Sequence, residues 1–76
     1  MKMEIKIDLK ADAMYIRFQK GKFAKNKVID EDTIIDLDEK GRLLGIEILN
    51  VTKKIPLEYL SDVSVKIPIK REKLVS

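Results

Sequence analysis

The fold is decided by residues 33–49, which read TIIDLDEKGRLLGIEIL. Short aliphatic and β-branched runs flank the tetrapeptide Asp38-Glu39-Lys40-Gly41, and such runs favour strands over helices. Gly41 supplies the positive φ that a tight turn needs, and the Asp38 carboxylate can accept hydrogen bonds from the backbone ahead of it. The stretch therefore predicts a β-hairpin. Its second strand is partly apolar on both faces, which suits a central place in a sheet.

The residues on either side continue the strand pattern. Apolar and polar residues alternate over 3–9 and over 14–18, which indicates two half-buried strands. A further short strand is expected at Val28-Ile29. Residues 63–69 alternate as well, and Pro68 places this predicted last strand at an edge of the sheet, because proline cannot donate to the ladder.

One short helix is expected between Asn50 and Asp62. Pro56 is acceptable in the first turn of a helix, and Leu57 and Leu60 lie three residues apart on one side of it. We therefore expect an α+β fold, in which a small antiparallel β-meander of about five strands carries one short helix on one face. Residues 1–69 would form the single β-rich domain and residues 70–76 a polar C-terminal tail.

The composition of the 76-residue chain bounds its chemistry. There is no Cys and no His, so disulfides and thiolate nucleophiles are excluded and the usual general base is missing. We expect a protein that is not an enzyme and carries no cofactor. No long apolar run occurs, so a membrane partner is not expected and the cytoplasm is the expected location. Many lysines and few amides suggest a thermophilic source.

Acidic residues gather between positions 30 and 38. Asp36 and Asp38, with Gly41 and Glu47 after them, follow the spacing of a calcium-binding EF-hand loop. Lys40, however, would place an ammonium group at a ligand position, and the flanks alternate as strands where an EF-hand has helices. A turn is therefore preferred. Binding of a divalent cation stays open as an alternative function, with oxygen ligands from Asp30, Glu31, Asp32, Asp36 and Asp38.

Lysines gather in the segment before the acidic cluster. Residues 20–27 read KGKFAKNK, a run of basic residues with Phe23 among them. Lysines that follow phosphates and rings that stack on bases are typical of single-strand nucleic-acid binding. Lysines also protect the edges of sheets against aggregation. Nucleic-acid binding is therefore an alternative function, and the residues that would carry it are Lys20, Lys22, Lys25 and Lys27.

Two stretches together resemble a known family. Residues 12–18 (DAMYIRF) are similar to its first signature and residues 36–49 (DLDEKGRLLGIEIL) to its second, with the acidic step VIDED at 28–32 between them. The family is catalogued as domain of unknown function 2283. The resemblance implies a small β-rich fold and no established activity. Members are often encoded beside small toxin-like proteins, so the resemblance also implies an antitoxin-like role.

The function expected first is that of a non-enzymatic protein-interaction module. Tyr15, Leu43 and Leu49 are predicted to share the face opposite Met14 and Ile16. If the helix leaves them uncovered, these three side chains would bind a small protein partner or a second copy. Charge is also uneven, with +5 over residues 1–29 and −5 over residues 30–47. Such blocks can steer a charged partner or pair with each other across the sheet.

Overall fold

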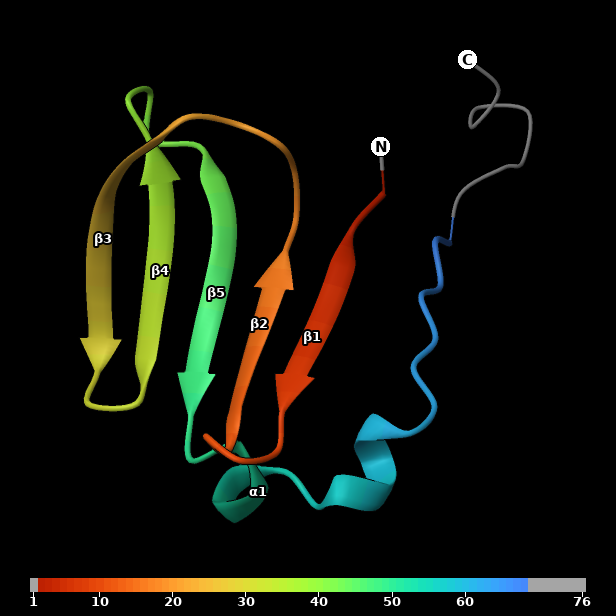
Figure 1. Ribbon diagram of the computed structural model, residues 1–76. Coiled ribbons are helices and arrows are strands. Elements are labelled where there is room, and N and C mark those ends of the chain that lie inside the picture. The colour runs from red at the N-terminus through yellow and green to blue at the C-terminus, as the bar shows by residue number, and fades with distance from the viewer. Residues whose placement is uncertain (1, 69–76) are drawn as a thin grey trace.

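Five antiparallel strands form one open sheet in the computed structural model, which describes residues 2–68 (Figure 1). The strands are β1 (Glu4–Asp8), β2 (Ala13–Arg17), β3 (Phe23–Asp30), β4 (Thr33–Asp38) and β5 (Leu43–Leu49). Their order across the sheet is β1-β2-β5-β4-β3. The predicted α+β fold with a small antiparallel sheet is confirmed.

The predicted hairpin over residues 33–49 is β4 and β5. Gly41 takes a φ of 78° in its turn, as expected of glycine there. β5 lies between β2 and β4, so the strand predicted to be central is central. The pairing shifts by one residue between Asp36 and Leu37, because Gly45 lies opposite Asp36 and Leu43 opposite Leu37. Leu44 is the extra residue of this β-bulge.

The third strand is longer than predicted, and the predicted last strand is not formed. β3 spans eight residues, Phe23–Asp30, and pairs with β4 through a tight turn at Glu31-Asp32. Residues 63–68 are in no strand and are exposed; Ile69 and the predicted tail at 70–76 lie outside the described residues. A hairpin between neighbouring segments closes a short loop, and this favours β3 as the partner of β4.

The predicted helix is divided into two single turns, α1 (Val51–Lys54) and the 3₁₀ helix η1 (Leu57–Leu60). The one short α-helix that was predicted is present as α1, but it is shorter than expected, because Pro56 does not lie in the first turn of an α-helix. It precedes η1, and the residue before it, Ile55, is extended with φ −131° and ψ 120°. Proline disfavours the helical conformation in the residue before it, so the α-helix ends there.

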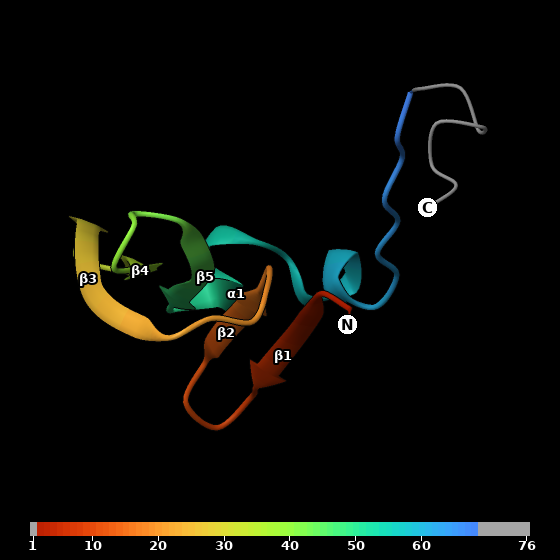
Figure 2. The same ribbon diagram turned by 90° about the horizontal axis from the view of Figure 1, so that it is seen from above.

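The sheet has only one layer over most of its area. Figure 1 shows α1 beyond the end of β5, and Figure 2 shows η1 and the chain after it on one side of the sheet and the loop between β2 and β3 on the other. In the described part of the chain, the buried hydrophobic side chains are Met14, Leu44 and Val51. A search of residues 2–68 finds no helix with the length and hydrophobicity that a membrane span needs.

Candidate interaction face

The strand register gives the sheet one apolar face. Residues directly opposite each other on neighbouring strands have side chains on the same face. Ile16 lies between Ile5 of β1 and Ile46 of β5, and Ile46 lies opposite Ile35 of β4. Side chains in phase with these form the apolar face, made up of Ile5, Ile7, Met14, Ile16, Thr33, Ile35, Leu37, Leu43, Ile46 and Ile48.

The two margins of the apolar face differ. At the β1 margin, Leu57 and Leu60 of η1 line a shallow hollow together with Ile7 and Leu9. At the β3 margin, Lys25 lies opposite Leu37 and Lys27 opposite Ile35, so both lysines are on this face. The middle of the apolar face is half-buried by its own neighbours, and no second layer of the described chain covers it.

The opposite face is polar, and Tyr15 crosses it. β5 separates β2 from β4, yet the Tyr15 hydroxyl donates a hydrogen bond to Asp36 of β4 at 3.1 Å. The ring reaches over Gly45, where a Cβ atom would lie 2.2 Å from the Tyr15 hydroxyl oxygen. Asn26 of β3 donates a second hydrogen bond to Asp36 at 2.7 Å. Partial burial, and then the Asp36 carboxylate, raise the pKa of the Tyr15 hydroxyl.

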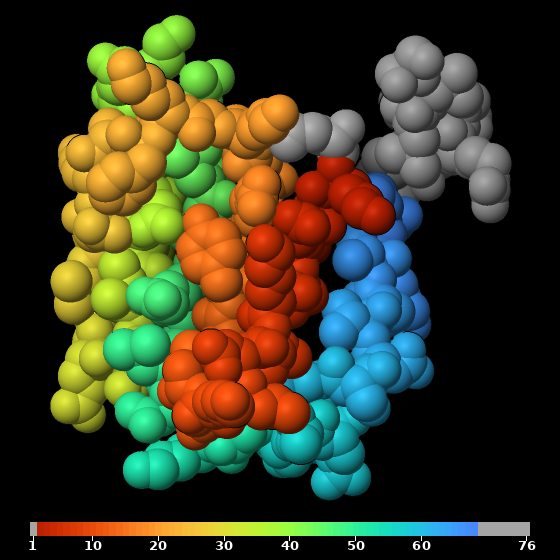
Figure 3. All heavy atoms as spheres, viewed as in Figure 1, coloured from red at the N-terminus to blue at the C-terminus, as the bar shows by residue number. Residues whose placement is uncertain are grey.

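The loop between β2 and β3 covers part of the polar face. Figure 3 shows this loop, in orange, lying in front of the green strands. Gly21 packs on Leu44, and a Cβ atom at Gly21 would lie 2.5 Å from a methyl carbon of that leucine. The Gln19 side-chain amide donates to the Leu43 carbonyl at 2.7 Å. The loop and the hydrogen bonds to Asp36 therefore cover more of the polar face than the described chain covers of the apolar face.

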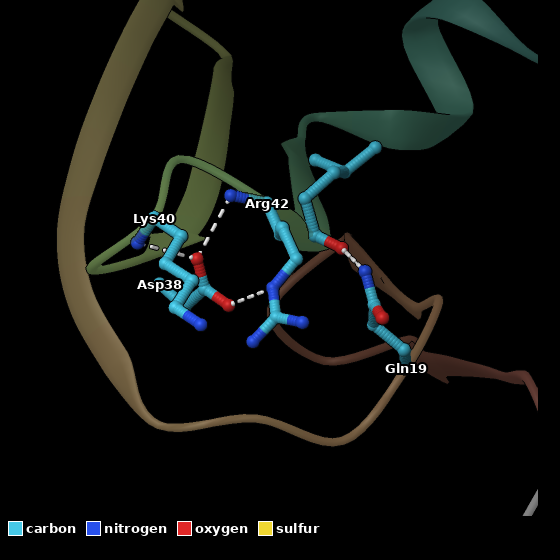
Figure 4. Close-up of polar contacts among 5 residues, drawn as sticks. Gln19, Asp38, Lys40 and Arg42 are labelled. Atoms are coloured by element: carbon cyan, nitrogen blue, oxygen red, sulfur yellow. Dashed lines mark hydrogen bonds and ion pairs between the residues drawn. The ribbon is translucent and has the colours of Figure 1, made fainter.

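Asp38 organises the turn between β4 and β5 (Figure 4). One carboxylate oxygen accepts from the backbone N–H of Lys40 at 2.9 Å and of Arg42 at 2.8 Å. The other accepts from the Arg42 Nε at 2.7 Å. The residue is 4% exposed. These hydrogen bonds hold the pKa of the Asp38 carboxyl below its usual value, and the bond from the Arg42 backbone lowers it most.

The residues predicted to bind a partner do not form one patch. Ala13 lies opposite Leu49 and Tyr15 opposite Glu47, so Tyr15 and Leu49 share the polar face as predicted. Leu43 does not join them, because the bulge at Leu44 places it opposite Leu37. Tyr15 already holds Asp36 within the chain. The glycine inside an otherwise apolar strand, Gly45, was the sequence signal for this crossing ring.

The lysines proposed for nucleic-acid binding fall into two pairs. Lys20 and Lys22 lie in the loop on the polar side of the sheet, beside Arg17 and Asp38 respectively. Lys25 and Lys27 lie on β3 and share the apolar face. The four ammonium groups therefore do not line one continuous groove in the structure, and nucleic-acid binding stays a prediction.

The acidic residues proposed for cation binding are separated along β4. Asp30 and Asp32 lie at its start, where Asp30 accepts from the Asp32 N–H at 2.8 Å and Asp32 pairs with Lys54 at 3.4 Å. Asp38 lies at its end and holds the turn there. Over residues 2–68, no group of three or more carboxylates is placed to hold a metal ion. The hydrogen bond to the Asp32 backbone lowers the pKa of Asp30.

Comparison with known proteins places the chain in a family. The family described as Protein of unknown function (DUF2283) matches residues 4–51. No curated protein and no solved structure matches the chain. The matched stretch begins with β1 and ends at Val51, so it contains all five strands, the Tyr15–Asp36 pair and the Asp38 turn. Because this match covers more than half of the chain, the protein belongs to the DUF2283 family.

Proposed function

We propose that this protein is a non-enzymatic protein-interaction module that binds its partner through the apolar face of the sheet. One observation carries the proposal: the aliphatic side chains of β1, β2, β4 and β5 share a face that no second layer of the described chain covers. A sheet with one hydrophobic face becomes stable by burying it against another layer. The partner would supply that layer.

The size of the core supports the same proposal. Hydrophobic residues make up 45% of the sequence, yet only three of the large ones among residues 2–68 are buried. A chain of this length rarely gains more than about 3–5 kcal/mol from its own core. Covering the half-buried isoleucines of the apolar face would add about 25 cal/mol for each Å² of apolar surface removed from water. A partner on this face therefore stabilises the fold as well as being bound by it.

An antitoxin-like role is the finer form of this proposal. It would place a small protein on the apolar face and keep that protein inactive while bound. The support for it is the resemblance in sequence together with an open aliphatic surface of the kind that protein partners cover. Nucleic-acid binding has less support, because two of its four lysines, Lys25 and Lys27, border this aliphatic face.

Two neighbouring residues on β4 offer a matched test. Ile35 lies opposite Ile46 on the apolar face, and Ile34 lies opposite Glu47 on the polar face. Both are half-buried. The test uses three tagged full-length baits in the native lysate: the unchanged chain, Ile35→Lys and Ile34→Lys. The proteins that each bait retains are quantified by mass spectrometry. We expect Ile35→Lys to retain at least about tenfold less protein than the unchanged chain, since a lysine there places a charge in the interface.

The control variant carries the same substitution one residue away. Ile34→Lys should retain the proteins that the unchanged chain retains, and circular dichroism should show that both variants are folded. Equal retention by the two variants, or loss with Ile34→Lys alone, would remove the apolar face as the binding surface. The same proteins with the same stoichiometry on all three baits would contradict the proposed function.

A further inference from the structure

We infer that the partner on the apolar face is a second copy of this chain, packed face to face about a two-fold axis that runs parallel to the strands. This inference rests on the proposed function and names its partner. Most soluble oligomers are symmetric, and two-fold dimers are the commonest, because each contact then occurs twice. An axis parallel to the strands brings the β3 margin of one copy beside η1 at the β1 margin of the other.

The exposed area is large enough for such a dimer. The accessible surface of the chain is 6497 Å², whereas a compact protein of its mass exposes about 4,800 Å². The exposed segment 61–68 contributes to this excess, and so does the open apolar face of the sheet. A stable interface of standard size needs about 800 Å² from each partner.

The shape of the apolar face suits a second sheet. Its central residues are isoleucines from four adjacent strands, without a charged residue among them. Two sheets with such faces pack about 10 Å apart. At the β1 margin η1 occupies part of this layer, since Leu57 and Leu60 line a hollow together with Ile7. The β3 margin has no such cover among the described residues, so a partner sheet can lie over the middle and the β3 side.

The two margins have opposite charge. The β3 margin presents Lys25 and Lys27 on the apolar face, with Asp30 at the end of the strand opposite Thr33, so its net charge is positive. The β1 margin carries the exposed acidic residues Glu58 in η1 and Asp62 directly after it. The proposed axis brings the basic margin of each copy beside the acidic residues at η1 of the other copy, so this contact occurs twice. An axis perpendicular to the strands would instead place basic over basic, which electrostatic complementarity disfavours.

The chain after η1 leaves the sheet on the same side. Figure 2 shows residues 62–68 rising from η1 on the side of the apolar face, and Figure 3 shows them standing apart from β1. Val63, Val65 and Ile67 are 54%, 70% and 55% exposed. A second copy on the apolar face would lie beside this segment. The alternating residues that predicted a strand would then have an apolar surface to cover.

The test exchanges the charges of the two margins in purified full-length protein. Three variants are compared with the unchanged chain: Lys25→Glu/Lys27→Glu, Glu58→Lys/Asp62→Lys, and all four substitutions together. Analytical ultracentrifugation at low ionic strength gives the mass and the dissociation constant of each. We expect the unchanged chain to sediment at twice its 8.8 kDa mass. Each double variant should raise the dissociation constant at least about tenfold, and the fourfold variant should restore it to within about threefold.

The loop lysines provide the matched control. Lys20→Glu/Lys22→Glu makes the same change in net charge on the other side of the sheet, so it should leave the dissociation constant within about threefold. An unchanged chain that stays monomeric at all concentrations would overturn the inference. So would a dimer whose double variants are not rescued by the fourfold exchange, or one that the loop variant weakens equally. If the unchanged chain is a monomer and Ile35→Lys still retains less protein from the lysate, the dimer is wrong but the proposed function stands.

Discussion

Replacing Gly45 with alanine is expected to lower the free energy of unfolding by about 2–3 kcal/mol, the range for overpacking a well-filled site. In an ordinary strand this substitution stabilises, because alanine has less conformational freedom to lose than glycine. At Gly45 the sign reverses. An added Cβ would lie 2.2 Å from the Tyr15 hydroxyl oxygen and 2.8 Å from the Ile16 carbonyl oxygen. The second neighbour is backbone, so it cannot move without disturbing the pairing of β2 with β5.

Thermal unfolding followed by circular dichroism measures this effect. For a domain of this size each kcal/mol shifts Tm by about 4–8 °C, so a decrease of about 10–20 °C is expected for Gly45→Ala. Tyr15→Ala provides the control, because it removes the crossing ring. The double variant should recover part of the loss caused by Gly45→Ala, since the Ile16 carbonyl still lies too close. A Gly45→Ala protein as stable as the unchanged chain would show that Tyr15 does not cross β5.

Much of the sheet could be predicted from its alternating residues. The hairpin of β4 and β5 has an apolar run on each side of an Asp-Glu-Lys-Gly turn, and local chemistry alone decides such a structure. β3 could not be predicted in full, because residues 23–27 (FAKNK) include three polar residues and its side chains are exposed on both faces. Its partner β4 holds it in place. Residues 63–68 show the reverse case, because they have the alternating pattern but no partner in the described chain.

The candidate interaction face was harder to predict than the strands. Alternation assigned Ile16 and Ile46 correctly to one face, but it could not show that no second layer covers them. A bulge changes the phase of every residue beyond it, and the bulge at Leu44 moved Leu43 away from Tyr15 and Leu49. The sides of the sheet on which the lysines lie were hard to predict for a similar reason. The basic run was visible in the sequence, but which of its lysines lie on each side of the sheet depends on where β3 begins.

Replacing Asp38 with alanine is expected to lower Tm by about 10 °C, since it removes three hydrogen bonds from a turn that closes the β4–β5 hairpin. The backbone N–H groups of Lys40 and Arg42 would lose an acceptor whose own side chain is buried. Asp38→Asn should cost less, because its side-chain oxygen can still accept from both backbone groups. It loses the ion pair with the Arg42 guanidinium, which the carboxylate holds at 2.7 Å.

The same carboxylate makes stability depend on pH in the acid range. Its pKa lies below the ordinary value of 3.8 in the folded chain, so the unfolded chain takes up the proton first as the pH falls. The stabilisation is complete above the unfolded value and is lost as the pH falls through the folded one. The Asp38→Asn variant has no carboxylate at this position, so it has no such contribution to lose. Asp30, whose pKa is also lowered, is present in both proteins. Melting curves from pH 7 to pH 2 should therefore show the Tm difference between the unchanged chain and Asp38→Asn narrowing below about pH 4. A difference that stays constant over that range would mean that the Asp38 carboxylate is not held by the turn.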